Sequence, residues 1–143
     1  MISILSFALI QIAVPAASPP PSTAAMTEQH LRDISCVAFF GVSAAIMRQG
    51  VVGYNLIDVR TDGPRWAGIV GERVMRDTGL PKEVVGYAIS EAVPSAQRIF
   101  QVQNPDPVIK AREAECLPRM RADFAAADAQ DAPLPKPQGR SAK

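Results

Sequence analysis

The chain has 143 residues and a formal net charge of +1 at pH 7, from 15 Lys and Arg against 14 Asp and Glu. Charges of both signs are spread along the sequence, which argues against a nucleic-acid-binding protein because such proteins concentrate basic residues on one face. The length suits a single domain, and a region of about 100 residues remains for a core once the ends are discounted.

Residues 1–25 have the composition of an export signal followed by a Pro-rich linker. Met1–Val14 is an apolar run without a charge, and Ser18–Ser22 is rich in Pro. The run is too short for a membrane-spanning helix, which takes roughly 20 apolar residues. We therefore expect a secretory signal cleaved after Ala16 or Ala25. No Lys or Arg precedes the run, which leaves an uncleaved anchor or a buried N-terminal helix as alternatives.

Residues 27–49 are expected to form one long central helix. Thr27 is placed to cap its start, and Gly50 follows its end. No charged residue occurs between Ile34 and Met47. A helix that is apolar on nearly all sides belongs in the middle of a bundle.

The two cysteines, Cys36 and Cys116, are predicted to form a disulfide. An even count of cysteines in an exported chain favours a bridge, and closing a loop of this length is worth roughly 4 kcal/mol on the chain-entropy model. Two buried free thiols are the alternative. A metal site is not expected, because the chain has no CxxC motif and His30 is its only histidine.

Three further helices are expected after the central one, over about 62–78, 81–100 and 106–124. Asp62–Pro64 and Asp106–Pro107 are start signals, Gly79 is a stop signal, and Pro94 is expected to kink or end its helix. Pro118 should distort the last helix.

Residues 51–60 fit a short strand, a helical turn or irregular structure, and we favour one of the latter two. The apolar stripes are Trp66, Ile69, Val70, Val74 and Met75, then Val84, Val85, Ala88, Ile89 and Ala92, then Ile109, Cys116, Met120 and Phe124.

The sequence thus predicts an all-α fold, a small bundle of about four to five helices closed by one disulfide. The expected division is a signal and linker over 1–25, a helical domain over 26–124 and a disordered tail over 125–143. The tail is rich in Ala, Asp, Pro, Gln and Lys, a composition that does not bury enough surface to offset the entropy of ordering.

The segments Val51–Tyr54 and Val84–Tyr87 both read VVGY. The match admits an internal duplication of a helical hairpin, but two short matches are weak evidence, and we favour coincidence.

Candidate catalytic groups all have simpler structural explanations. We expect His30 to be an exposed first-turn histidine, although Glu28 and Asp33 lie near it in sequence. Glu113 and Glu115 point in different directions on one helix, and Arg112 and Arg119 are expected to pair with them. Ser43 and Ser90 have no activating motif around them.

Two groups of charged residues are expected to be solvated helix faces, with a surface for an acidic partner as the alternative. These groups are Arg73, Arg76 and Asp77, and Arg112, Arg119 and Arg121.

We therefore predict a periplasmic or secreted binding module, of a chaperone-like, inhibitor-like or immunity-type kind, whose partner is another envelope protein. We expect no catalytic residue, no cofactor, no metal, no nucleic acid and no membrane span after signal cleavage. The alternative function is a carrier of a small apolar ligand between its helices.

Overall fold

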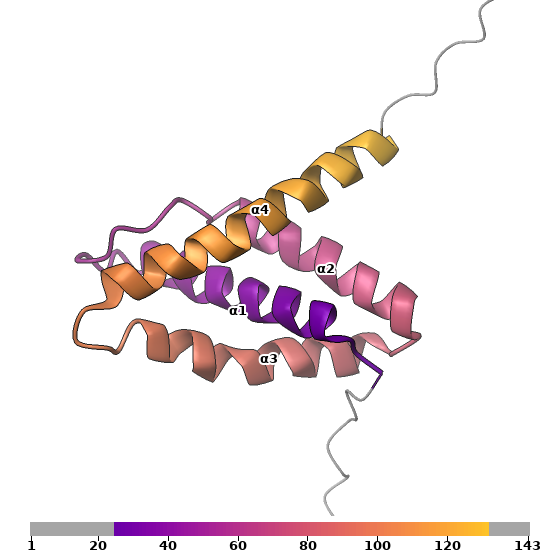
Figure 1. Cartoon of the computed structure of the whole chain (residues 1–143), viewed down its shortest axis with the longest axis horizontal. Coiled ribbons are helices and arrows are strands. Elements are labelled where there is room, and N and C mark those ends of the chain that lie inside the picture. Colours follow the sequence, from indigo (N-terminus) through magenta and orange to yellow (C-terminus); the bar gives the residue numbers. More distant parts are fainter. Residues whose placement is uncertain (1–24, 132–143) are drawn as a thin grey trace, which may run out of the picture.

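This computed structural model describes residues 25–131, which contain four α-helices. They are α1 (Glu28–Arg48), α2 (Asp62–Thr78), α3 (Lys82–Ile99) and α4 (Pro105–Asp131). α1 lies in the middle of the bundle between α2 and α3, and α4 crosses obliquely over α1 and α2 (Figure 1). The predicted all-α bundle around an apolar first helix is confirmed. The expected signal and linker, over residues 1–25, lie outside the described residues except for residue 25, and so do the last residues of the expected tail, 132–143.

The central helix α1 begins at the predicted cap. The Thr27 hydroxyl accepts a hydrogen bond from the His30 backbone N–H at 3.2 Å, and the His30 ring accepts one from the Thr27 backbone N–H at 3.2 Å. The two residues thus form a reciprocal capping box. At the other end, Gln49 caps the helix and Gly50 turns the chain with a φ of 67°.

α1 also supplies the middle of the core, where Phe39 and Phe40 are almost fully buried. It is the one helix in the described range that is long and apolar enough to cross a membrane. However, 56% of its most apolar 18-residue stretch is buried inside the bundle. Its place at the centre of the bundle accounts for its apolar character.

α2 and α3 follow the predicted stripes and stops. Trp66, Val70 and Val74 are fully buried, and Gly79 ends α2 in the left-handed conformation with a φ of 69°. α3 does not end at Pro94 but continues to Ile99. Ala96 and Phe100 are buried beyond the proline, and this packing keeps the last turn on the core despite the lost backbone hydrogen bond.

α4 is longer than predicted. It is a single helix past Pro118, and it runs to Asp131 instead of ending at Phe124. The expectation that the disordered tail begins at residue 125 is therefore wrong for residues 125–131. Ala is the strongest helix former, and α2 holds this part of α4. The Arg65 guanidinium lies 4.5 Å from the centre of the Phe124 ring and pairs with Asp128 at 2.6 Å.

The connection between α1 and α2, residues 49–61, is irregular, in agreement with one of the two favoured expectations. The two VVGY segments have different structures, since Val51–Tyr54 lies in this connection and Val84–Tyr87 lies inside α3. Gly53 has a φ of 110°, whereas its counterpart Gly86 is helical. The repeat therefore does not mark a duplicated structural unit.

Candidate functional site

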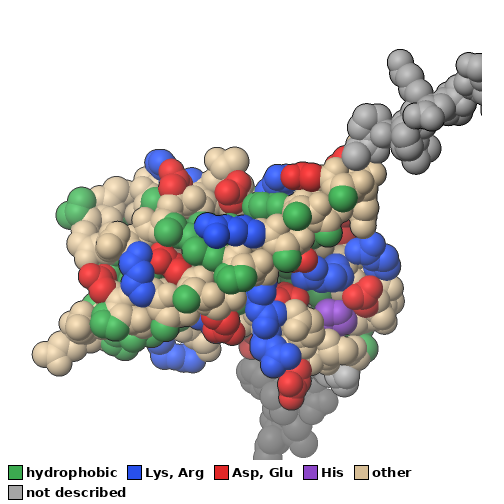
Figure 2. Space-filling view, turned by 45° about the horizontal axis from the view of Figure 1, so that its top comes forward, with side chains coloured by type: hydrophobic (Ala, Val, Ile, Leu, Met, Phe, Trp, Pro, Cys, Tyr) green, Lys and Arg blue, Asp and Glu red, His purple; other side chains and the backbone are tan. Residues whose placement is uncertain are grey.

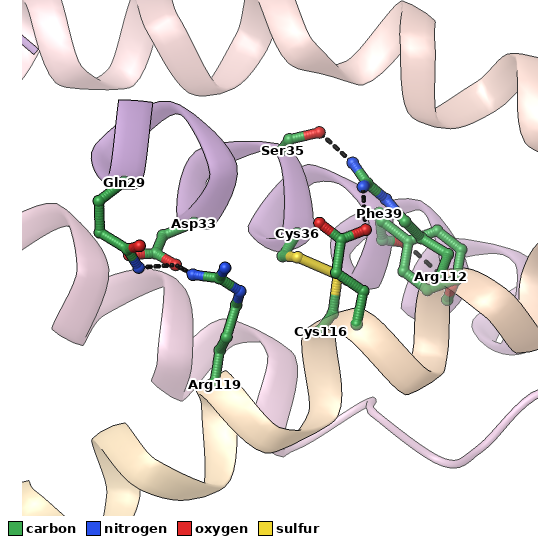
Figure 3. Close-up of a disulfide and its surroundings, with 10 residues drawn as sticks. Gln29, Asp33, Ser35, Cys36, Phe39, Arg112, Cys116 and Arg119 are labelled. Atoms are coloured by element: carbon green, nitrogen blue, oxygen red, sulfur yellow. Dashed lines mark hydrogen bonds and ion pairs between the residues drawn. A yellow bond between two sulfur atoms is a disulfide. The ribbon is translucent and has the colours of Figure 1, made fainter. Parts of the chain in front are cut away.

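The predicted disulfide joins the middle of α1 to the middle of α4. Cys36 and Cys116 are bonded, with their Cα atoms 5.5 Å apart, and both residues are 0% exposed. Figure 3 shows the bridge at the crossing of the two helices. It therefore joins the first helix of the described chain to the last one.

A carboxylate lies buried one helical turn before Cys36. The Asp33 side chain is 2% exposed and pairs with Arg73 of α2 at 3.0 Å and with Arg119 of α4 at 2.9 Å. The Gln29 amide also donates to it, at 3.0 and 3.1 Å (Figure 3). One acidic group on the central helix therefore binds basic groups from two other helices.

A second carboxylate extends this cluster. Asp123 of α4 accepts a hydrogen bond from the Trp66 indole N–H at 2.6 Å and a further one from Arg73. Burial by itself lowers the pKa of the Arg73 guanidinium, but the hydrogen bond and charge of Asp123 and the charges of Asp33 and Asp77 together raise that pKa. The cluster is an internal ion network that connects α1, α2 and α4.

These contacts correct the expectation for the arginines. Arg73 and Arg119 are not on solvated faces, because their side chains are only 27% exposed and point to Asp33. Arg76 and Arg121 are exposed as expected. On the face that carries α4, basic and acidic side chains alternate without a patch of one sign (Figure 2).

His30 is buried, so its expected exposure is also wrong. The residue is 7% exposed. One ring nitrogen caps α1, and the other lies 3.2 Å from the Asp77 carboxylate of α2. Both ring nitrogens are thus occupied by structural partners, which explains the residue without catalysis.

The remaining candidates also have structural partners. Glu115 pairs with Arg112 at 2.6 Å as expected, but Glu113 pairs with Lys110 at 2.9 Å instead of an arginine. Glu113 is 4% exposed and accepts a hydrogen bond from the Ile57 backbone N–H at 3.0 Å. It therefore fastens the connection between α1 and α2 to α4.

Arg112, Ser43 and Ser90 also have hydrogen-bond partners within the bundle. Arg112 also donates to Ser35 of α1 (Figure 3). The Ser43 hydroxyl is buried and donates to the Phe39 carbonyl at 2.9 Å, and Ser90 donates to the Tyr87 carbonyl at 2.7 Å. Both serines satisfy their hydroxyls within their own helix.

Large apolar side chains are exposed mainly at one end of the bundle. Among the six such side chains in the described range, Val51, Val52, Val102 and Val108 are 48%, 91%, 44% and 42% exposed. They belong to residues 49–61, residues 100–104 and the first turn of α4, which lie together at one end of Figure 1. We call this region the apolar end. Leu31 and Tyr87 are the two exposed elsewhere.

An open groove of about 480 Å³ lies between α1 and α3 at the apolar end. Its lining contains no charged side chain and consists of Gly41, Val42, Ala45, Ile46, Gln49, Tyr54, Val93, Gln97, Phe100 and Gln101. Tyr54 and Phe100 meet edge to face with ring centres 5.4 Å apart, and the Tyr54 hydroxyl donates to the Phe100 carbonyl at 3.1 Å. The apolar and aromatic side chains of this lining suit apolar side chains of a partner, and its glutamine amides suit peptide groups.

Sequence reasoning missed both the ion network and this groove. The network left a readable signal, because Asp33, Arg73 and Arg119 each lie three residues from a buried apolar residue of their own helix, namely Cys36, Val70 and Cys116. Charged residues at that spacing share the buried face. The groove left none, since it joins residues that are distant in the chain.

No family model matches the chain, and no curated protein or solved structure matches it either. Residues 25–131 hold no group of three or more His, Cys, Asp or Glu side chains placed to bind a metal. The described surface offers apolar and amide groups at one end, around a groove whose lining carries no charge.

Proposed function

We propose that the protein is an exported, disulfide-stabilised helical module that binds a protein partner through the apolar end. The observation that carries the proposal is the concentration there of exposed valines, including Val52 at 91% exposure, beside an uncharged groove. Exposed apolar groups gathered beside a groove are typical of interaction sites, whereas single scattered ones are not.

Export is supported by the cross-link. Disulfides persist in the periplasm or outside the cell and are rare in a reducing cytosol. Cys36 and Cys116 are the only cysteines of the chain, and they are bonded to each other. The apolar run Met1–Val14 supports the same compartment.

A protein partner suits the groove better than an enclosed small ligand. The groove is open to solvent and rimmed by Gln49, Gln97 and Gln101, whose amides form hydrogen bonds with a peptide backbone. Carriers of small ligands instead bury most of the ligand surface in a concave pocket.

The test is affinity capture from an envelope and culture-medium extract of the native host, with wild type, Val52→Asp and Leu31→Asp compared. Leu31 is a matched control, because it is an exposed apolar residue on α1 at 47% exposure, outside the apolar end. We expect a stoichiometric partner that Val52→Asp loses and Leu31→Asp retains. Equal capture by all three proteins would refute the proposed site.

A further inference from the structure

The His30 ring joins the start of α1 to the end of α2. The residue is 7% exposed, and each of its ring nitrogens has a different partner. Nδ1 accepts a hydrogen bond from the Thr27 backbone N–H at 3.2 Å, and Nε2 lies 3.2 Å from a carboxylate oxygen of Asp77. The first contact closes the first turn of α1, and the second holds α1 against α2.

These two contacts define the tautomer of the neutral ring. The Thr27 N–H is a donor, so Nδ1 offers it a lone pair. The Asp77 carboxylate is an acceptor, so the ring proton lies on Nε2. A neutral His30 therefore satisfies both partners at once.

A second proton on the ring makes the two contacts incompatible. The proton enters at Nδ1, because Nε2 already carries one. Both nitrogens of an imidazolium are donors, so the Thr27 N–H then faces another N–H, and no orientation of the charged ring restores an acceptor. The contact with Asp77 becomes stronger, since a hydrogen bond from an imidazolium to a carboxylate is charge-assisted.

The surroundings of the ring leave this choice to its two partners. The Asp77 side chain is 43% exposed, so water has access to the pair. Within the described residues, the ring forms side-chain hydrogen bonds with Thr27 and Asp77 alone.

Other charged side chains lie at this end of the bundle, where α1 and α3 begin and α2 ends (Figure 1), but none of them pairs with the ring in the described range. They are Glu28, Arg32 and Asp33 of α1, Arg73 and Arg76 of α2, Lys82 and Glu83 of α3, and Arg119 of α4. Asp33 is itself held by Arg73 and Arg119. The chain has no second histidine, so no other imidazole takes up protons beside this one.

We infer that His30, with its partners Thr27 and Asp77, is a pH-sensitive latch at the start of α1. As the pH falls through the range in which histidines titrate, about pH 8 to 5, the ring releases the Thr27 N–H and holds Asp77 more firmly. Acid thus loosens the first turn of α1 and the buried Met26 before it, while the contact between α1 and α2 stays closed. The latch lies at the opposite end of the bundle from the apolar end (Figure 1) and is independent of the proposed function.

The experiment is an NMR titration of the disulfide-bonded protein from about pH 7.5 to about pH 5.5, above the range in which Asp and Glu side chains ordinarily titrate. The signals of the single histidine report its protonation, and the Thr27 amide reports the cap. We expect the Thr27 amide proton to move upfield with the same midpoint as the ring. Its protection from hydrogen exchange should fall about five-fold, the usual contribution of a helix cap. A Thr27 amide that stays unchanged while the ring titrates, or a ring that stays neutral throughout, overturns the inference.

Two variants test the two contacts separately. His30→Gln keeps an acceptor for the Thr27 N–H and has no ring to titrate, so its Thr27 amide should not respond. A response equal to that of wild type would exclude the ring as the cause. Asp77→Asn keeps an oxygen opposite Nε2 but removes the charge, so acid should loosen residues 75–78 of α2 in this variant and not in wild type. Equal behaviour of these residues in both proteins would exclude Asp77 as the partner that holds the charged ring. Circular dichroism at both ends of the pH range checks that each variant is folded.

Discussion

Replacing Asp33 with Ala is expected to lower the free energy of unfolding by about 3 kcal/mol, because removing one member of a buried ion pair leaves the other charge unpaired, at a cost of about 3–5 kcal/mol. The Asp33 side chain is 2% exposed and accepts hydrogen bonds from Gln29, Arg73 and Arg119. Both arginine side chains are 27% exposed, and Arg73 keeps Asp123 as a partner. Water and the second carboxylate therefore hold the loss near the lower end of that range.

The assay is urea unfolding followed by the fluorescence of Trp66, the only tryptophan, which is fully buried. The midpoint should fall while the slope m stays constant. Asp58→Ala is the control, since it removes an ion pair with Arg60 that is exposed to water and contributes little to stability. Asp33→Ala and Arg119→Ala should be non-additive because the two groups are in contact. A loss from Asp33→Ala no larger than that of the control, or strict additivity, would refute the reasoning.

Three further predictions concern the other anchors. Replacing Cys36 and Cys116 together with Ala should lower the free energy of unfolding by about 4.5 kcal/mol on the chain-entropy model, and a loss below about 1 kcal/mol in the same urea assay would contradict a role of the bridge in stability. His30→Gln should be more stable than His30→Ala by about 1 kcal/mol in thermal unfolding, because a Gln amide restores the capping acceptor; equal stabilities would count against that role. Hydrogen bonds from Arg60 lower the pKa of Asp58 from its ordinary value of 3.8 to about 2. Any stabilisation from this pair is therefore complete at a pH above 3.8 and is lost as the pH falls through about 2. An NMR titration of the Asp58 carboxyl should show this pKa, and Arg60→Gln should raise it; an unchanged titration would exclude Arg60 as the cause.

The helices were predictable because their signals are local. The Thr27 cap and the Gly79 stop each act on a neighbouring turn of backbone, and the stripe of Trp66, Val70 and Val74 follows from helical spacing. The disulfide was predictable because a chain with two cysteines allows a single pairing, and the expected export favours an oxidising compartment.

The positions where sequence reasoning was wrong or left alternatives open depend on tertiary contacts. Of the two outcomes predicted for Pro94, a kink or an end, the end is excluded, because the buried Ala96 and Phe100 hold α3 on the core past one lost hydrogen bond. The distortion expected at Pro118 stays a prediction. Composition made His30 and Arg73 look solvated, yet each finds a carboxylate on another helix. Such partners are far apart in the sequence, so local pattern does not reveal them.

The position of α4 depends on anchors of different kinds spaced along one face. Over its whole length only Ile109, Glu113, Cys116 and Met120 are buried, so apolar packing alone defines its direction weakly. The disulfide fixes a single point and leaves rotation about it free. Contacts of Arg119 and Asp123 with α1 and α2 follow within two turns on the same side, and a second and third point fix the direction of the helix. Glu113 of α4 in turn accepts a hydrogen bond from residue 57, in the connection that bears the exposed valines Val51 and Val52. The buried charges of the core and the exposed valines of the apolar end are therefore linked through α4, the helix that the disulfide joins to α1.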